Sequence, residues 1–215
     1  FCHVINRLST NKEDEKKYKT SLKEMRNLVN AIKENHLEKT DDVEQIGKKY
    51  NIAVFFDSRT MEDIKKLKIS KENRVEVKDY TITIDGEGVV EIDDALSCKK
   101  LENGNYLLGV HIASVLGYYP YGSKIVEEAI GRDRSIYLPR KYQVKENDYE
   151  RVIPLFPYDF SANKASLIEG LPRLTRSYYF ELNPDGSIVH EDFFKTVTTS
   201  NKKTSFTEID EILNH

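Results

Sequence analysis

The spacing of apolar residues in the N-terminal third of the chain is mainly that of helices. Over residues 22–32, apolar side chains recur every three or four positions between Lys- and Glu-rich faces, which predicts an amphipathic helix. A second helix is expected after an N-cap at Thr40, and a third at Thr60, where Thr-Met-Glu-Asp has the form of a capping box. The apolar run at residues 52–56 predicts a buried strand. Residues 1–73 are therefore predicted to form a mainly helical segment and a linker.

The remainder of the chain alternates between strand-like and helix-like patterns. Four strands are expected, at residues 80–84, 106–113, 176–182 and 187–194. Turn sequences at Asn103-Gly104 and at residues 183–186 precede or join them. Helices are expected at residues 123–132 and after a cap at Ser205 or Thr207. Because strands and helices are mixed without regular βαβ alternation, the pattern favours an α+β fold.

The composition permits one domain, or one domain with an appendage, and does not indicate a membrane protein. The chain has 215 residues, against about 100–200 for a typical domain. Its longest strongly apolar run has five residues, far fewer than the roughly 20 needed to span a bilayer. Two cysteines, Cys2 and Cys98, are too few for a disulfide framework, which predicts a reducing compartment such as the cytoplasm. The chain begins at Phe1 rather than Met, so we expect a fragment of a longer protein.

The charge balance provides no general basic field for nucleic acid, because the net charge is −3. The acidic excess lies in residues 81–215, which hold 15 basic and 21 acidic side chains. A negative total does not exclude a nucleic-acid enzyme, since carboxylates that bind metal ions are neutralised by those ions.

Four of these carboxylates are crowded into one short segment, at Asp85, Glu91, Asp93 and Asp94. Crowded carboxylates repel one another, so either some take up protons or a cation lies among them. Oxygen-only ligands favour Mg²⁺, and two such ions about 3.5–4 Å apart can stabilise both oxygens of an in-line phosphoryl displacement. The segment suggests metal-assisted phosphodiester hydrolysis. From composition alone, a solvated acidic turn remains the commoner interpretation, and a calcium loop is disfavoured because the EF-hand spacing is absent.

Seven short motifs occur in the order typical of one enzyme family. They resemble the catalytic (RNB) domain of the ribonuclease II / ribonuclease R exoribonucleases. The matching stretches are Thr83-Ile-Asp85, Asp93-Asp94-Ala95, Gly109-Val-His-Ile-Ala113, Gly122-Ser123 with Ala129 and Arg132, Ser135-Ile-Tyr-Leu-Pro139, Ile153-Pro-Leu-Phe-Pro157, and Ser161 with Ala165-Ser-Leu167. The resemblance implies that residues 74–215 form the N-terminal half of an RNB-type domain, a mixed or antiparallel sheet with flanking helices, incomplete and preceded by the helical segment.

The resemblance also assigns roles to the acidic residues. It implies that Asp85, Glu91, Asp93 and Asp94 bind one or two Mg²⁺ ions, with Mn²⁺ as an alternative, and that Asp93 and Asp94 are catalytic. Glu91 stands where the family usually has Asp, so its longer side chain moves the carboxylate oxygens and requires compensation.

Three further residues are implied to contact RNA: Tyr137 and Phe206 by stacking, and Arg132 through phosphate. From the residues alone, a half-buried core tyrosine and a core-facing phenylalanine are alternatives for the two aromatics. His111 is expected to be a core histidine with satisfied hydrogen bonds. Ser114 replaces an aspartate that often follows in the family, and residues 140–151 are an insertion at the expected edge of the RNA path.

The function that follows from the resemblance is Mg²⁺-dependent 3′→5′ hydrolysis of single-stranded RNA, releasing nucleoside 5′-monophosphates. We expect the fragment alone to be a poor nuclease. Two alternatives remain: a catalytically weak RNA-binding member of the same fold, motivated by Glu91, Ser114 and Phe206, and a generic acidic-loop domain with no role in nucleic-acid chemistry.

Overall fold

A computed structural model describes residues 43–67, 69–137 and 152–214, which form two compact units. One unit contains the described residues up to 63 together with 122–137 and 152–157, and the other contains the described residues of 64–121 and 158–214. Each unit contains two separate stretches of the chain. The predicted division into residues 1–73 and 74–215 follows the chain order instead, and it stays a prediction. The helix at residues 22–32, the cap at Thr40 and the insertion at 140–151 lie outside the described residues.

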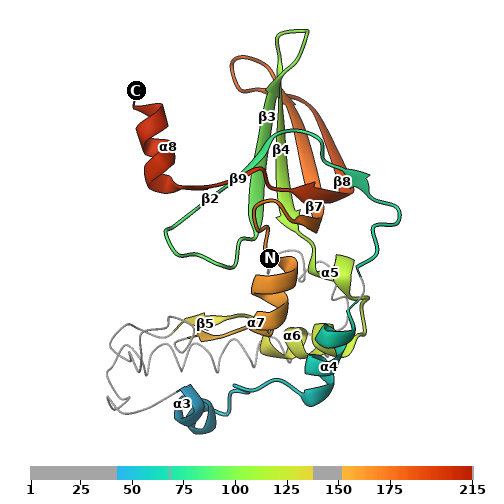
Figure 1. Ribbon diagram of the computed structural model, residues 1–215, viewed down its shortest axis with the longest axis vertical. Helices are drawn as coiled ribbons and strands as arrows, with labels where there is room; N and C mark the ends of the chain where they lie inside the picture. Colours follow the sequence, from blue (N-terminus) through green and yellow to red (C-terminus); the bar gives the residue numbers. More distant parts are fainter. Residues whose placement is uncertain (1–42, 68, 138–151, 215) are drawn as a thin grey trace. The chain divides into compact units, whose positions relative to one another are not determined.

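The second unit is built on a seven-stranded mixed sheet with the order β1-β8-β7-β4-β3-β2-β9. Its strands are β1 (Val75–Glu76), β2 (Thr81–Asp85), β3 (Asp94–Lys100), β4 (Tyr106–Ala113), β7 (Pro172–Leu182), β8 (Ile188–Thr199) and β9 (Lys202–Ser205). The strands from β2 to β8 in this order pair antiparallel, whereas β1 and β9 add parallel strands to β8 and β2 (Figure 1). The predicted α+β class, a mixed sheet with flanking helices, is confirmed.

The helices are short. They are α3 (Val43–Tyr50), α4 (Ser58–Lys66), α5 (Val115–Tyr118), α6 (Lys124–Arg132), α7 (Tyr158–Phe160), the π-helix η3 (Ser161–Ala165) and α8 (Phe206–Leu213). The cap predicted at Ser205 is confirmed, because its side chain and that of Glu208 form a reciprocal capping box. Helix α4 begins at Ser58 rather than Thr60, since the Asp57 carboxylate already accepts the Arg59 amide at 2.8 Å.

One predicted strand is wrong and one strand was missed. Residues 52–56 do not form a strand, and the Ala53 carbonyl among them accepts a hydrogen bond from Arg132 of α6. The first unit also contains a small sheet, which pairs β5 (Ile136–Tyr137) with β6 (Val152–Ile153). Strand β3 was not predicted, because its outer residues, Asp94, Lys99 and Lys100, are charged and only Ala95 and Ser97 are buried. By contrast, β4 has the predicted bounds, and β7 and β8 extend beyond them.

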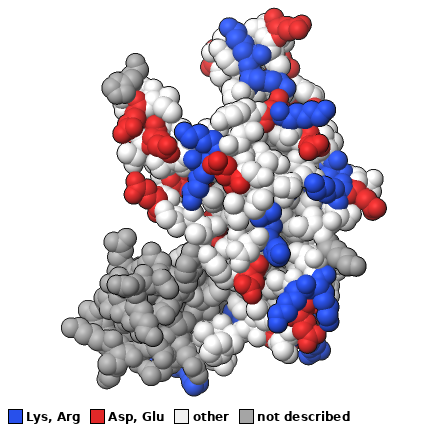
Figure 2. All heavy atoms as spheres, in the orientation of Figure 1, with Lys and Arg blue, Asp and Glu red and all other residues white. Residues whose placement is uncertain are grey.

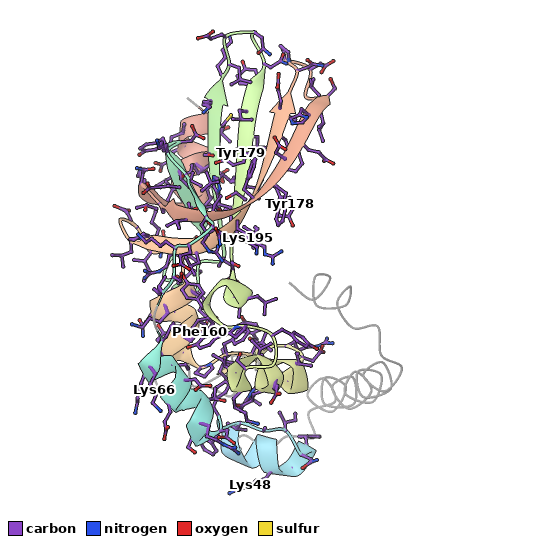
Figure 3. All side chains as sticks on the ribbon, turned by 90° about the vertical axis from the view of Figure 1, so that its right-hand side faces the viewer. Lys48, Lys66, Phe160, Tyr178, Tyr179 and Lys195 are labelled. Carbon is purple, nitrogen blue, oxygen red and sulfur yellow. The ribbon has the colours of Figure 1, made fainter. Side chains whose placement is uncertain are left out.

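One face of the central strands buries polar side chains. His111 is fully buried and contacts the hydroxyls of Ser97, at 2.9 Å, and Ser177, at 2.7 Å. Burial lowers the pKa of His111 to about 4, so the ring is neutral at pH 7. This confirms the core histidine. Tyr178, labelled in Figure 3, lies on the opposite face, where its ring contacts that of Phe193 with centroids 4.8 Å apart and both side chains remain exposed.

No helix in the described part of the chain is both long and apolar enough to cross a membrane.

Candidate active site

The four acidic residues predicted as metal ligands come from one pair of strands and the connection between them. Asp85 is the last residue of β2, and Asp94 is the first residue of β3. The two strands are antiparallel neighbours, with Thr81 opposite Ser97 and Ile82 opposite Leu96, and the Asp94 charge acts on Asp85 across their ends. Glu91 and Asp93 lie in the connection, where the Asp93 carbonyl accepts the Ala113 amide of β4 at 2.8 Å. The predicted acidic loop is therefore a connection whose last acidic residue, Asp94, is already paired in the sheet.

The carboxyl groups influence one another's protonation. Burial, followed by the charges of Glu91, Asp94 and Asp85, raises the pKa of Asp93 to about 6. Burial and then the Asp94 charge raise the pKa of Asp85, and the Lys203 ammonium opposes this rise. Neighbouring protein atoms desolvate the Asp93 carboxyl group, but the residue as a whole is exposed, so solvent screens part of the rise in its pKa. Repulsion of this kind is relieved when a proton or a cation binds.

The backbone of residues 90–92 is held by Ser166, the residue that follows η3. The Ser166 hydroxyl donates to the Val90 carbonyl at 2.7 Å and accepts from the Ile92 amide at 3.0 Å. The Leu167 amide donates to the Ile92 carbonyl at 2.9 Å. The Ile92 side chain is buried in a small core with Ala95, Ala113 and Leu167. The acidic residues on either side of Ile92 are thus carried on an anchored backbone.

Two of the carboxylates differ in their hydrogen bonding. The Ser161 hydroxyl donates to Oε1 of Glu91 at 2.5 Å. Oδ2 of Asp85, in contrast, is buried without a hydrogen-bond partner among the described residues. A buried carboxylate oxygen is costly unless a proton, a donor or a cation pairs with it.

The chemistry of this set fits a hard cation, although its side chains are not assembled as a coordination shell. The set offers carboxylate oxygens alone, which are the ligands that Mg²⁺ and Mn²⁺ prefer, and Oδ2 of Asp85 is buried with no partner in the described ranges. Within the described ranges, however, no group of three or more His, Cys, Asp or Glu side chains lies close enough to hold a metal ion. Mg²⁺ usually takes one or two carboxylates together with waters and substrate phosphate oxygens, so such an ion does not need three ligands from the protein.

The two aromatic residues predicted to stack on RNA are both at the surface. Tyr137 lies in β5 of the first unit and is 72% exposed. Phe206 is the first residue of α8 in the second unit and is 61% exposed. A core position, the alternative considered for each, is therefore wrong.

Arg132 has a set of partners that the sequence did not indicate. Its guanidinium donates to the backbone carbonyls of Ala53, at 2.7 Å, and Phe55, at 2.6 Å, and it pairs with Glu128 at 3.1 Å. It also lies over the Phe56 ring, 3.7 Å from the centroid, and its side chain is only 6% exposed. These contacts hold residues 53–56 against α6, and the phosphate contact implied for Arg132 stays a prediction.

Sequence reasoning missed Ser166 and Lys203. Lys203 of β9 donates from Nζ to the Val89 carbonyl at 2.6 Å. Ser166 lay within a recognised motif, but nothing in the sequence indicates that its hydroxyl reaches residues 74 and 76 positions earlier. Over the visible face, Lys and Arg are interspersed with Asp and Glu rather than gathered into one basic patch (Figure 2).

Solved structures with a similar fold include two of different character. Ribonuclease R of Mycoplasma genitalium, in complex with ribose-methylated single-stranded RNA, has a TM-score of 0.68 and 23% identity over 80% of this chain and 26% of that one. Yeast Ssd1, described as a pseudonuclease, has a TM-score of 0.56 and 21% identity over 66% of this chain and 17% of that one. At these identities the likeness concerns the fold alone.

Sequence relatives are closer. Ribonuclease R of Thermotoga maritima is 41% identical over 141 residues, which are 65% of this chain and 18% of that protein. Ribonuclease R 1 of Lactococcus lactis is 32% identical over 135 residues, 63% of this chain and 15% of that protein. The chain thus spans less than a fifth of the length of these two relatives. The RNB domain family profile matches residues 74–215, about two thirds of the chain. The chain therefore belongs to the RNB-domain family, that of ribonuclease II and ribonuclease R.

Proposed function

We propose that the protein is a divalent-metal-dependent exoribonuclease that hydrolyses single-stranded RNA from its 3′ end and releases nucleoside 5′-monophosphates. The observation that carries the proposal is that Asp85, Glu91, Asp93 and Asp94 lie at the end of β2, in the connection and at the start of β3, where their charges influence one another, inside a match to the RNB domain. Relatives named ribonuclease R support the RNA substrate.

We assign different roles to the carboxylates because their surroundings differ. Asp85 offers a buried oxygen that lacks a partner among the described residues, and Asp94 lies beside it on β3, so these two are the proposed direct metal ligands. When bound, Mg²⁺ would activate the attacking water and neutralise charge that develops on the phosphate. Asp93, whose pKa is about 6 without metal, would hold a proton at its carboxyl group under mildly acidic conditions and release it once a cation relieves the repulsion.

The exposed aromatic rings supply contacts for the RNA. Tyr137 and Phe206 each present a face on which a base can stack, at about 1–3 kcal/mol per base. Stacking does not depend on base identity, so these contacts suit an enzyme that removes nucleotides one after another.

The direct test follows a single-stranded oligoribonucleotide labelled at its 5′ end and incubated in Mg²⁺ with the full-length protein that contains this chain. We expect a ladder of successively shorter products, abolished by EDTA and by Asp94→Asn, and mononucleotide products identified by chromatography. Asp185→Asn is the matched control, because Asp185 is an acidic residue in the turn between β7 and β8, bonded to Ser187. Equal shortening by the Asp94→Asn and wild-type proteins would contradict the proposal.

The second candidate is a catalytically weak RNA-binding protein. Glu91 favours it, because an Asp is usual at this position and the longer side chain alters the carboxylate geometry. This candidate predicts that the same oligoribonucleotide is bound in Mg²⁺ but keeps its length. It also predicts that Glu91→Asp increases the rate of shortening.

A further inference from the structure

The π-helix η3 places two serine hydroxyls where they reach the same acidic segment. The Ser166 amide donates to the Ser161 carbonyl at 2.9 Å, five residues back, which is the hydrogen bond that defines a π turn. In an α-helix, residues five apart point in directions about 140° apart. The wider π turn brings the two side chains closer to one side. Such turns are rare and are frequent at functional sites.

The two hydroxyls bond different parts of residues 90–92, one the backbone and the other a side chain. Ser166 is 1% exposed and bonds the backbone on both sides of Glu91, at the Val90 carbonyl and the Ile92 amide. Ser161 bonds the Glu91 side chain itself, at Oε1. The backbone of Glu91 and one of its carboxylate oxygens are therefore both held by the same turn.

The turn is itself firmly anchored. The Arg173 side chain donates from Nε to the Ser166 carbonyl at 2.8 Å and from Nη2 to the Asn163 carbonyl at 3.2 Å. Phe160, immediately before the turn, is fully buried against the rings of Tyr118 and Tyr119. The Ser161 hydroxyl thus extends from a packed support rather than from a free loop.

We infer that Ser161 is a positioning residue for Glu91 in metal binding, an inference that rests on the proposed function. The hydrogen bond to Oε1 restricts rotation of the carboxylate and so limits the positions open to Oε2. It compensates for the extra methylene that Glu91 has over the usual Asp. Groups that orient a metal ligand in this way typically change metal affinity about 10- to 100-fold when they are removed.

The test is Mn²⁺ binding, measured by calorimetry and by electron paramagnetic resonance without RNA. Ser161→Ala should weaken Mn²⁺ binding about 10-fold. Ser161→Thr keeps the hydroxyl and should retain most of the affinity, and Ser187→Ala, in the β7–β8 turn, should leave affinity unchanged. Thermal unfolding by circular dichroism checks that the variants are folded, and a folded Ser161→Ala protein with wild-type Mn²⁺ affinity overturns the inference.

A double-variant cycle tests whether Ser161 acts through Glu91. Asp at position 91 is shorter by about 1.5 Å, which places its carboxylate beyond reach of Ser161. In the Glu91→Asp protein, Ser161→Ala should therefore change Mn²⁺ affinity less than 2-fold. A 10-fold loss in that background as well would overturn the inference.

The same measurements separate this inference from the proposed function. If Asp94→Asn abolishes Mn²⁺ binding but Ser161→Ala does not weaken it, the inference alone fails. If the wild-type protein binds no Mn²⁺, the metal-dependent function fails and the inference with it.

Discussion

Asp85 closes β2 and Asp94 opens the neighbouring antiparallel strand β3, and the charge of Asp94 contributes to the raised pKa of Asp85. This relationship follows from strand pairing, since antiparallel neighbours joined by a short connection bring the end of one strand to the start of the next. Asp85 and Asp94 thus belong to two strands of the sheet, whereas Glu91 and Asp93 lie in the connection between them. The position of this connection is fixed by hydrogen bonds from Ser161 and Ser166 and by the small core around Ile92.

The first prediction concerns the stability of the metal-free protein between pH 4 and pH 6. The pKa of Asp93 is about 6 in the folded state and about 3.9 when unfolded, so in this range the folded state binds more protons. The free energy of unfolding should therefore fall as the pH rises from about 4 to about 6 and then level off. Urea denaturation of the wild-type and Asp93→Asn proteins measures this as a difference.

The matched variant isolates the effect. The amide that replaces the carboxyl group in Asp93→Asn does not titrate, so contributions from other groups are common to both proteins and cancel in the difference. Addition of Mg²⁺ should remove the loss, because a cation stabilises the ionised carboxylate. A wild-type stability that rises relative to Asp93→Asn over this range would contradict the raised pKa.

The sequence predicts those elements of the fold that form through contacts between neighbouring residues, and it misses those that form through contacts between residues far apart in the chain. Strand β4 was predicted with its observed bounds because the Asn103-Gly104 turn sequence precedes it, and such a turn depends on neighbouring residues alone. The structure agrees, since Gly104 has a φ of +90°. Strand β3 was missed because much of it is exposed and charged, so its sequence lacks the alternation of apolar and polar residues typical of a strand. Backbone pairing with β2 on one side and β4 on the other stabilises it instead.

The same distinction applies to the site. The acidic residues were found because they are close in sequence and match motifs. The Ser161–Glu91 bond joins residues 70 positions apart, and the Arg132–Ala53 bond joins residues 79 apart. Contacts of this kind depend on the tertiary fold, so the phosphate-binding role expected of Arg132 could not be weighed against its structural contacts beforehand.

The second prediction concerns His111, which acts on stability with the opposite sign to Asp93. Burial lowers its folded-state pKa to about 4, against about 6.5 when unfolded, so the unfolded state binds more protons between these values. The contribution of His111 to stability should be complete above about pH 6.5 and be lost as the pH falls towards 4. His111→Leu should abolish this dependence in urea denaturation.

The same variant should also lower stability at pH 7. The substitution removes the ring partner of the Ser97 and Ser177 hydroxyls in a buried setting, at a cost of about 1–3 kcal/mol. His190→Leu is the control, since His190 is exposed and bonds only at the surface to Asp192. An unchanged free energy of unfolding in His111→Leu would show that the buried bonds contribute nothing net.

The third prediction separates the structural role of Arg132 from RNA binding. Arg132→Ala removes the partly buried ion-pair partner of Glu128, and because the Thr60 hydroxyl still donates to Glu128 at 2.6 Å, the loss should lie below the roughly 3–5 kcal/mol typical of a fully buried pair. Arg132→Lys should lose part of this stability, because an ammonium cannot reproduce the planar fork that reaches the Ala53 and Phe55 carbonyls together. Denaturation measures the loss, and RNA affinity per folded molecule should change less than 2-fold. A large loss of affinity in a stable Arg132→Lys protein would support the phosphate-binding role and contradict this prediction.

The last prediction concerns the two exposed aromatic residues. Tyr137→Ala and Phe206→Ala should each weaken binding of a single-stranded oligoribonucleotide by about 1–3 kcal/mol, or roughly 5- to 150-fold. Neither should lower thermal stability much, because both side chains are largely exposed. Phe206→Tyr keeps the stacking face and should retain affinity. Fluorescence anisotropy measures binding, and Tyr80→Ala, which removes another exposed aromatic ring, is the control. If Tyr80→Ala weakens binding as much as the other two, the effect reflects general loss of aromatic surface rather than stacking at Tyr137 and Phe206.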